Sequence, residues 1–190
     1  YTGEDTLSLH DALPIYYLKA DFARYYPSTN WVFLRGAVVV SLGKDTIHAG
    51  EAGNAEDVKT AVHMGAVRIG HGVRIAGNKE VIQLVKDKGV FLEMCPTSNR
   101  QTKAMEEMSA YPLKAFLEMG LKVTLNTDDP AIERTTLSRE FRYMESLLDL
   151  TQEQKRLLLL NSVEAAFTSG NRKCKLKEQL FSEPYENYDE

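Results

Sequence analysis

The sequence predicts an α/β fold of the (β/α) barrel kind, and two observations support this prediction. Short apolar runs alternate with amphipathic segments of helical period, and the connections between them are short. Polar and titratable residues follow each apolar run, at the point where a parallel strand would end. In a (β/α) barrel this is the face on which sites are built. A doubly wound sheet remains an alternative, although its polar groups would concentrate at one switch point.

The first part of the chain, residues 1–41, has no predicted place in this fold. It contains two tyrosine pairs, a Pro-Ser-Thr-Asn breaker and no sustained period of either 2 or 3.6. Residues 6–15, with the sequence TLSLHDALPI, resemble a translated library-adapter sequence. We therefore expect this segment to be either an artefact of assembly or disordered. Residues 37–42, where this segment meets the regular part, are predicted as a short buried strand or the end of a helix.

The strands of the regular part are expected to be short and to end in polar groups. They are predicted at residues 45–49, 66–69, 90–95 and 121–126. The helices between them are predicted at residues 54–65, 78–89 and 112–120. After Pro130 two further amphipathic helices are expected, at residues 135–150 and 151–167.

Residues typical of helix ends support these boundaries. Asn54 is a suitable N-cap for the first helix, and Gly65 is a suitable stop. Gly89 ends the second helix in the same way. Thr151 and Gln154 have the spacing of a capping box, which predicts that the last helix begins there.

Composition and charge narrow the class of protein. The chain has 190 residues, of which 43% are hydrophobic and 26% charged, as in an ordinary globular domain. Its formal net charge of -4 gives no support to nucleic-acid binding. The two cysteines, Cys95 and Cys174, lie far apart, which argues against a disulfide framework and favours a cytoplasmic location. No apolar run is long enough to predict a membrane span.

Four motifs carry the residue types of metal-assisted hydrolysis: HAGE (48–51), RIGHG (68–72), EMCPTSN (93–99) and LNTDDP (125–130). A divalent metal held by neutral imidazoles and a carboxylate lowers the pKa of bound water, and a nearby acid or base moves the protons. Glycines beside these residues allow tight turns and leave room for a ligand. Each motif alone is weak, because a single strand-end histidine is more often structural and DDP is more often a helix cap. Four in order on successive strand ends are far more specific.

In this order and spacing, the four motifs resemble the adenosine deaminase family of zinc-dependent purine deaminases. The resemblance runs from about Leu42 to about Phe167. It implies a (β/α)8 barrel of the metal-dependent hydrolase kind, of which only the C-terminal half, strands five to eight, is recognisable. Residues 42–180 are expected to form this half-barrel, and residues 181–190 a charged tail.

The same resemblance implies a role for five residues around one zinc ion. His48 and Asp128 would be zinc ligands. Glu51 would be the acid that protonates purine N1, and His71 the group that orients and deprotonates the attacking water. Asp129 would be a hydrogen-bond partner of purine N7. Protonation of N1 makes C6 a better electrophile, and a carboxylic acid is suited to supply that proton near neutral pH.

The chain also departs from the family pattern. The family takes two more zinc ligands from an H-x-H motif on strand one, and the only histidines here are His10, His48, His63 and His71. His10 lies in the adapter-like stretch and receives no role, and His63 is expected to be a surface or packing residue. We therefore expect the chain to be a fragment that is inactive alone.

The implied activity is hydrolytic deamination of adenosine and deoxyadenosine to the inosine product and ammonia, in purine salvage. The expected partner is a small purine nucleoside, with no nucleic acid and no membrane, and the sequence predicts no oligomeric state. Deamination of adenine or another 6-aminopurine is the close alternative, although PTSNRQT (96–102) resembles the nucleoside-acting members more. A non-catalytic remnant that acts as a binding module is an alternative of another class.

Overall fold

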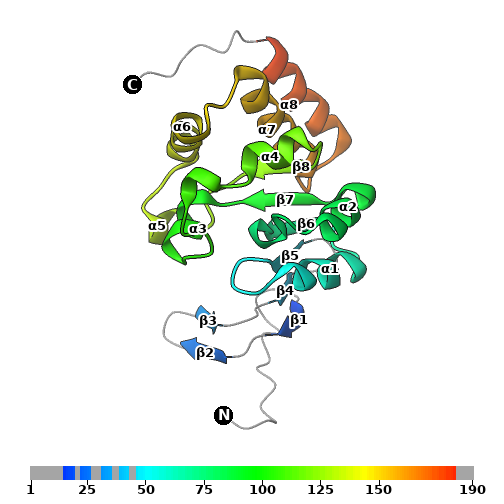
Figure 1. Ribbon diagram of the computed structural model, residues 1–190. Helices are drawn as coiled ribbons and strands as arrows, with labels where there is room; N and C mark the ends of the chain where they lie inside the picture. Colours follow the sequence, from blue (N-terminus) through cyan, green and yellow to red (C-terminus); the bar gives the residue numbers. More distant parts are fainter. Residues whose placement is uncertain (1–14, 20–21, 27–30, 36–38, 43–45, 183–190) are drawn as a thin grey trace.

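The computed structural model describes residues 15–19, 22–26, 31–35, 39–42 and 46–182. Their strands form two sheets (Figure 1). The larger sheet has the order β1 (Ile15–Lys19), β4 (Val39–Leu42), β5 (Thr46–Ala49), β6 (Arg68–His71), β7 (Phe91–Met94) and β8 (Lys122–Leu125). The smaller sheet pairs β2 (Phe22–Tyr26) with β3 (Trp31–Arg35).

Strands β5 to β8 are parallel and are joined by helical crossovers, as the sequence predicts. The order of these elements confirms part of a (β/α) barrel. The helices between the strands are α1 (Ala55–His63), η1 (Val73–Ile75), α2 (Lys79–Lys88), α3 (Pro96–Gln101), η2 (Met108–Ala110) and α4 (Leu113–Glu118). The helices after β8 are α5 (Pro130–Glu133), α6 (Leu137–Leu148), α7 (Gln152–Ala165) and α8 (Gly170–Ser182).

The helix ends lie where the capping residues predict them. The Asn54 side chain accepts a hydrogen bond from the Glu56 N–H at 2.8 Å and so caps α1. Gly89 ends α2 in the left-handed conformation, with a φ of 63°. The capping box of Thr151 and Gln154 is present at the start of α7. Local sequence therefore sets these boundaries.

Strand β4 answers one open question and adds a feature that the sequence did not predict. Residues 37–42 were expected as a strand or a helix end, and β4 is a strand that pairs with β5 in antiparallel register. Only residues 43–45 separate the two strands. A parallel pair needs a crossover of a dozen or more residues, so this connection allows only the antiparallel arrangement. Most of the adapter-like stretch and the end of the predicted tail, residues 1–14 and 183–190, lie outside the described residues.

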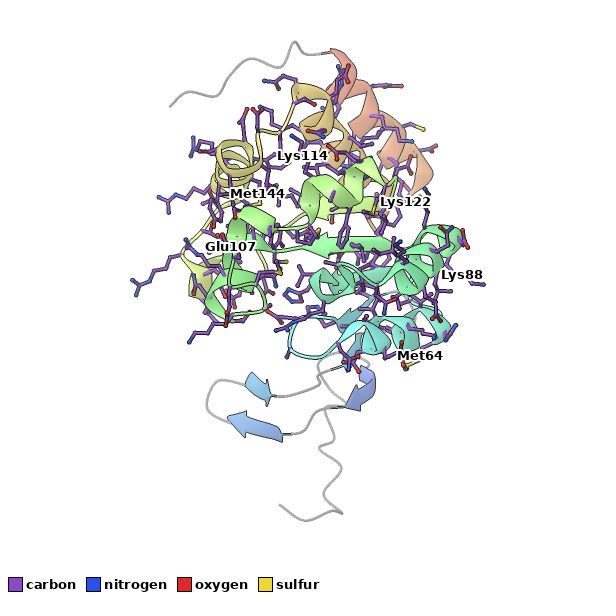
Figure 2. All side chains as sticks on the ribbon, viewed as in Figure 1. Met64, Lys88, Glu107, Lys114, Lys122 and Met144 are labelled. Carbon is purple, nitrogen blue, oxygen red and sulfur yellow. The ribbon has the colours of Figure 1, made fainter. Side chains whose placement is uncertain are left out.

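One face of the parallel strands forms the hydrophobic core. A single row of paired residues crosses the four strands, and each member is at most 2% exposed. The row consists of Ile47, Ile69, Leu92 and Val123. Side chains fill the space between the strands and the helices that cover them (Figure 2). In the part of the chain that the structure describes, no helix has the length and apolarity needed to cross a membrane.

The opposite row of side chains is polar. Arg68 on β6 and Glu93 on β7 form an ion pair of 2.9 Å, and the Arg68 Nε donates to Thr46 Oγ1 at 3.0 Å. The Arg68 guanidinium also stacks on the Phe167 ring, 3.5 Å from its centroid. In a closed barrel this row faces the interior, where polar groups lose their hydrogen bonds to water. The ion pair and the hydrogen bond offset this desolvation cost.

Strand β8 is the last strand of the larger sheet, and a side chain completes part of its hydrogen bonding. The Asn126 N–H donates to Met94 O on β7. Successive residues of a strand direct their backbone groups to opposite sides, and Val123 lies three residues before Asn126, so the Val123 carbonyl points away from β7. The buried Asn161 side chain on α7 donates to this carbonyl at 2.8 Å. A helix therefore provides the donor that a neighbouring strand would otherwise provide.

Replacement of Asn161 by leucine is expected to lower the free energy of unfolding by about 1–3 kcal/mol, because the Val123 carbonyl then lacks its partner. Chemical denaturation followed by circular dichroism measures this loss. Asn171→Leu on the exposed side of α8 is the matched control and should change stability far less. Equal losses in the two variants would show that the Asn161 hydrogen bond does not contribute measurably to the free energy of unfolding.

Candidate active site

The site lies at the carboxyl ends of β5 to β8, where β7 points toward α3 (Figure 1). His48, the third residue of β5, is half-buried and pairs with Gly70 on β6. A Cβ on Gly70 would lie 2.9 Å from the His48 ring, so only glycine leaves room for this imidazole. Burial lowers the pKa of His48, with a further lowering by His71 that the carboxylates of Asp128 and Glu51 oppose. The neutral ring, the form that binds a metal, is therefore favoured.

The turn after β5 explains the glycine of the HAGE motif. Gly50 has a φ of +71°, and a Cβ there would lie 2.6 Å from Val58 Cγ2 on α1. Its carbonyl accepts from the Arg74 N–H at 3.0 Å, and the Arg74 Nε donates to the Glu51 carbonyl at 3.0 Å. The tight turn predicted at Gly50 is confirmed. It brings Glu51 back over the end of the sheet within three residues of His48.

Two of the predicted site residues have left-handed backbone conformations. His71 has a φ of 70° and Asp128 a φ of 65°. Such angles are uncommon for residues other than glycine and cost of order 1–3 kcal/mol each. His71 is the last residue of β6, and Asp128 lies three residues after the end of β8; both side chains reach the same group at the strand ends.

Three titratable side chains come together there. Ligand atoms of Glu51, His71 and Asp128 all lie within 4.8 Å of one another, which the described residues show for no other such group. The His71 Nε2 is 3.3 Å from Glu51 Oε2 and 3.9 Å from Asp128 Oδ2. Imidazole nitrogen and carboxylate oxygen are donors that zinc accepts, so the residues present fit a divalent metal. Of the two predicted ligands, Asp128 belongs to this group. His48 lies beside the group, in an edge-on ring contact with His71 at 5.3 Å between centroids.

Asp129 has a structural contact of its own. Its Oδ1 accepts from the N–H groups of Ala131 and Ile132 at 3.1 and 3.2 Å, so it is the N-cap of α5. A helix cap is the more common role of a DDP motif, as the sequence analysis states. The two bonds fix the carboxyl group beside Asp128, and binding of a purine by Asp129 stays a prediction.

The sequence did not predict that one short helix contacts every member of the three-residue group. From α3, the Ser98 Oγ donates to Asp128 Oδ2 at 2.7 Å, and the Asn99 Nδ2 lies 3.0 Å from the His71 Nδ1. Thr102, the C-cap of α3, donates from Oγ1 to Glu51 Oε1 at 2.9 Å. The spacing of residues 98, 99 and 102 places their side chains on one side of a helix. This spacing is the sequence feature from which the shared contact could have been predicted.

A buried carboxylate fixes the start of this helix. Glu140 on α6 is fully buried and accepts from the Thr97 N–H at 3.1 Å and from the Thr135 Oγ1 at 2.5 Å. The Thr97 N–H belongs to the first turn of α3, where backbone donors lack helical partners. Glu140 therefore positions α3, and through α3 the three side chains of the site.

The other histidine and cysteine predictions concern positions outside this cluster. His63 is exposed at the end of α1, as expected for a surface residue. Cys95 is buried and Cys174 is exposed on α8, and both are free thiols. Burial raises the pKa of the Cys95 thiol well above its usual range, with a further rise from Asp128 and Glu51. His10 lies outside the described residues.

Comparison with known proteins decides the family. The family model described as Adenosine deaminase matches residues 36–183. The chain belongs to the adenosine deaminase family. A curated adenosine deaminase from Clostridium botulinum (strain Okra / Type B1) is 47% identical over 133 residues, which cover 70% of this chain and 40% of that protein. The chain thus spans about two fifths of the length of this relative.

Solved structures share the fold. An adenine deaminase from Arthrobacter aurescens has 31% sequence identity and a TM-score of 0.68, and the match covers 71% of this chain and 42% of that one. An amidohydrolase from Burkholderia ambifaria, solved with bound Zn, has 24% identity and a TM-score of 0.61 and covers 73% of this chain and 42% of its own. These similarities support the partial (β/α) barrel fold.

Gly70→Ala is expected to push the His48 ring from its position and to lower the free energy of unfolding by about 1–3 kcal/mol through overpacking. Denaturation gives the stability, and a crystal structure of the variant gives the ring position. Gly170→Ala is the matched control, because nothing lies within 4 Å of the added Cβ. An unmoved His48 ring in Gly70→Ala would contradict the close contact.

Glu140→Leu removes both acceptors and is expected to lower the free energy of unfolding by about 1–3 kcal/mol. The Thr97 N–H is then left buried without a partner, and the Thr135 hydroxyl keeps only its long hydrogen bond of 3.5 Å to the Thr136 carbonyl. Glu140→Gln keeps one acceptor and should lose less. Urea denaturation measures both, with the exposed Glu106→Leu as the control. The role of Glu140 would be wrong if Leu and Gln at this position were equally stable.

Proposed function

We propose that the complete protein to which this chain belongs deaminates adenosine and deoxyadenosine hydrolytically, with water adding at C6 and ammonia leaving. The observation that supports this best is the cluster of Glu51, His71 and Asp128 at the strand ends in a member of the adenosine deaminase family. Its groups are an acid, an imidazole and a metal-binding carboxylate, which are the types needed to add water to a purine ring.

His48 and Asp128 are the residues of this chain that would bind zinc. When bound, the ion would lower the pKa of a coordinated water toward 7. The lowered pKa of His48 supports this role, because a neutral imidazole is the form that ligates metal. The Burkholderia amidohydrolase with bound Zn has the same fold. Further ligands would come from the half of the barrel that the motifs of this chain do not include.

The remaining side chains act on the purine and on the water. Glu51 donates a proton to N1, which makes C6 more electrophilic, and Thr102 holds its carboxyl group in place. His71 orients the attacking water and takes its proton. Asp129 is the hydrogen-bond partner of N7 through its Oδ2, because its Oδ1 already accepts two backbone N–H groups.

Deamination of adenine is the second candidate, and one observation favours it. The Arthrobacter adenine deaminase shares 31% identity and the same fold with this chain. The addition of water at C6 is common to both substrates. Identity of 47% with an adenosine deaminase supports adenosine as the first candidate.

The decisive experiment measures ammonia release from adenosine and from adenine by the complete protein, alongside zinc content by mass spectrometry. We expect turnover of adenosine with about one zinc per chain. Residues 1–190 alone should show neither turnover nor stoichiometric zinc. Faster turnover of adenine than of adenosine would move the assignment to the second candidate, and zinc without either activity would refute deamination.

Glu51→Gln in the complete protein is expected to lower turnover by about 10²-fold to 10⁴-fold while zinc stays bound, because glutamine keeps the hydrogen bond of Thr102 but has no proton to donate. Ammonia release and zinc content are measured together. The exposed Glu178→Gln is the matched control. Wild-type turnover in a zinc-loaded Glu51→Gln variant would remove Glu51 from the acid role.

A further inference from the structure

A fourth carboxyl group, that of Glu133, lies beside the site and has no role in the proposed function. Glu133 is the last residue of α5 and is half-buried. Its Oε2 is the one buried side-chain oxygen or nitrogen that has no hydrogen-bond partner among the described residues. Such atoms are rare in folded proteins, and each calls for an explanation, of which a functional role is one.

The carboxyl group of Glu133 differs in this respect from the other three carboxyl groups of the site. Each of those accepts hydrogen bonds from the chain: Glu51 from Thr102, Asp128 from Ser98, and Asp129 from two backbone N–H groups. Packing holds the Oε2 of Glu133 inside the protein, whereas its Oε1 is not buried and accepts no hydrogen bond from the described residues. The chain therefore sets the orientation of this group without a donor, and Oε1 can accept one from a bound molecule.

Two observations place this carboxyl group toward Glu51 and Asp128. The Gln101 Nε2 donates to the Glu133 carbonyl at 3.2 Å, which holds the end of α5 beside the end of α3 that binds Glu51 (Figure 1). Burial raises the pKa of the Glu133 carboxyl group. The carboxylates of Asp128 and Glu51 raise it further, each by more than Asp129. Repulsion between charges falls with distance, so the group lies nearer to the first two carboxylates than to the third.

This position corresponds to one edge of the purine. In the proposed function Glu51 donates to N1, and water adds at C6 near Asp128, whereas Asp129 binds N7. The carboxyl group of Glu133 therefore lies at the edge of the ring that carries N1 and C6. The hydrogen-bond donor of adenosine on this edge is the 6-amino group, since N1 is an acceptor.

We propose that Glu133 contacts the substrate and accepts a hydrogen bond from its 6-amino group through Oε1. The inference rests on the proposed function for the placement of the purine. An ionised carboxyl group is an acceptor only, so it binds the amino group of the substrate but not the C6 oxygen of the product. Glu133 thereby selects 6-aminopurines among purine nucleosides.

The test compares two substrates of the complete protein that differ only at C6. Adenosine carries an amino group there, whereas 6-chloropurine riboside carries chlorine and has no N–H. Addition of water at C6 releases ammonia from the first, and chloride and a proton from the second, and gives inosine in both cases. Glu133→Ala is expected to lower kcat/KM for adenosine by about 10-fold through loss of one hydrogen bond, and to leave kcat/KM for the chloro compound within about 2-fold.

Further variants separate this contact from a general disturbance of α5. Ile132→Ala removes an exposed side chain next to Glu133 and should affect both substrates alike. Glu133→Gln keeps an acceptor oxygen and should retain more adenosine turnover than Glu133→Ala. An equal loss for both substrates in Glu133→Ala, or no loss for adenosine, overturns the inference, as does a glutamine variant no better than the alanine variant.

Equilibrium binding distinguishes this inference from the proposed function. If the complete protein releases no ammonia from adenosine, calorimetry compares adenosine with purine riboside, which has only hydrogen at C6. Weaker binding of adenosine but not of purine riboside in Glu133→Ala would then refute deamination and keep the contact. Deamination of adenosine that is unchanged in Glu133→Ala would do the reverse, and a complete protein that binds neither ligand would overturn both.

Discussion

The arrangement of the site depends on one turn of helix, α3, which makes a hydrogen bond to each of three strand-end side chains. Ser98, Asn99 and Thr102 reach Asp128, His71 and Glu51, which belong to three different strand ends. Strands place these residues at one edge of the sheet, but they do not fix the side-chain torsions. A short helix laid across the strand ends supplies this orientation, and it can do so because its own start is bound to the buried Glu140.

Much of the fold could be predicted because it depends on local signals. Asn54, Gly89 and the Thr151 capping box mark helix ends through contacts within a few residues. Strand and helix periods then gave the parallel order. The helix α3 was missed for the same reason, since its residues, PTSNRQ, are polar and show no apolar period. Its helical state depends on buried contacts with Glu140 on a distant helix, which no local pattern reveals.

The candidate site could be predicted in its residue types but not in its contacts. Gly70 looked like one more glycine of a turn motif, and its role became visible only when β5 and β6 paired and placed the His48 ring above it. The antiparallel pairing of β4 likewise depends on which strand lies next to β5. The role of Asp129 as a helix cap, in contrast, depends only on neighbouring residues and could be predicted from the sequence. Its contact with a substrate could not.

The dependence of α3 on Glu140 also sets an order of assembly during synthesis. Glu140 follows Thr97 by 43 residues, so strands β5 to β7 and α3 itself are translated before the carboxylate that fixes α3 exists. At about 5–20 residues per second, that interval is roughly 2–9 s. During it, Glu51 and His71 are present without the contact that fixes the start of α3. The oriented site therefore cannot be complete until α6 has been made.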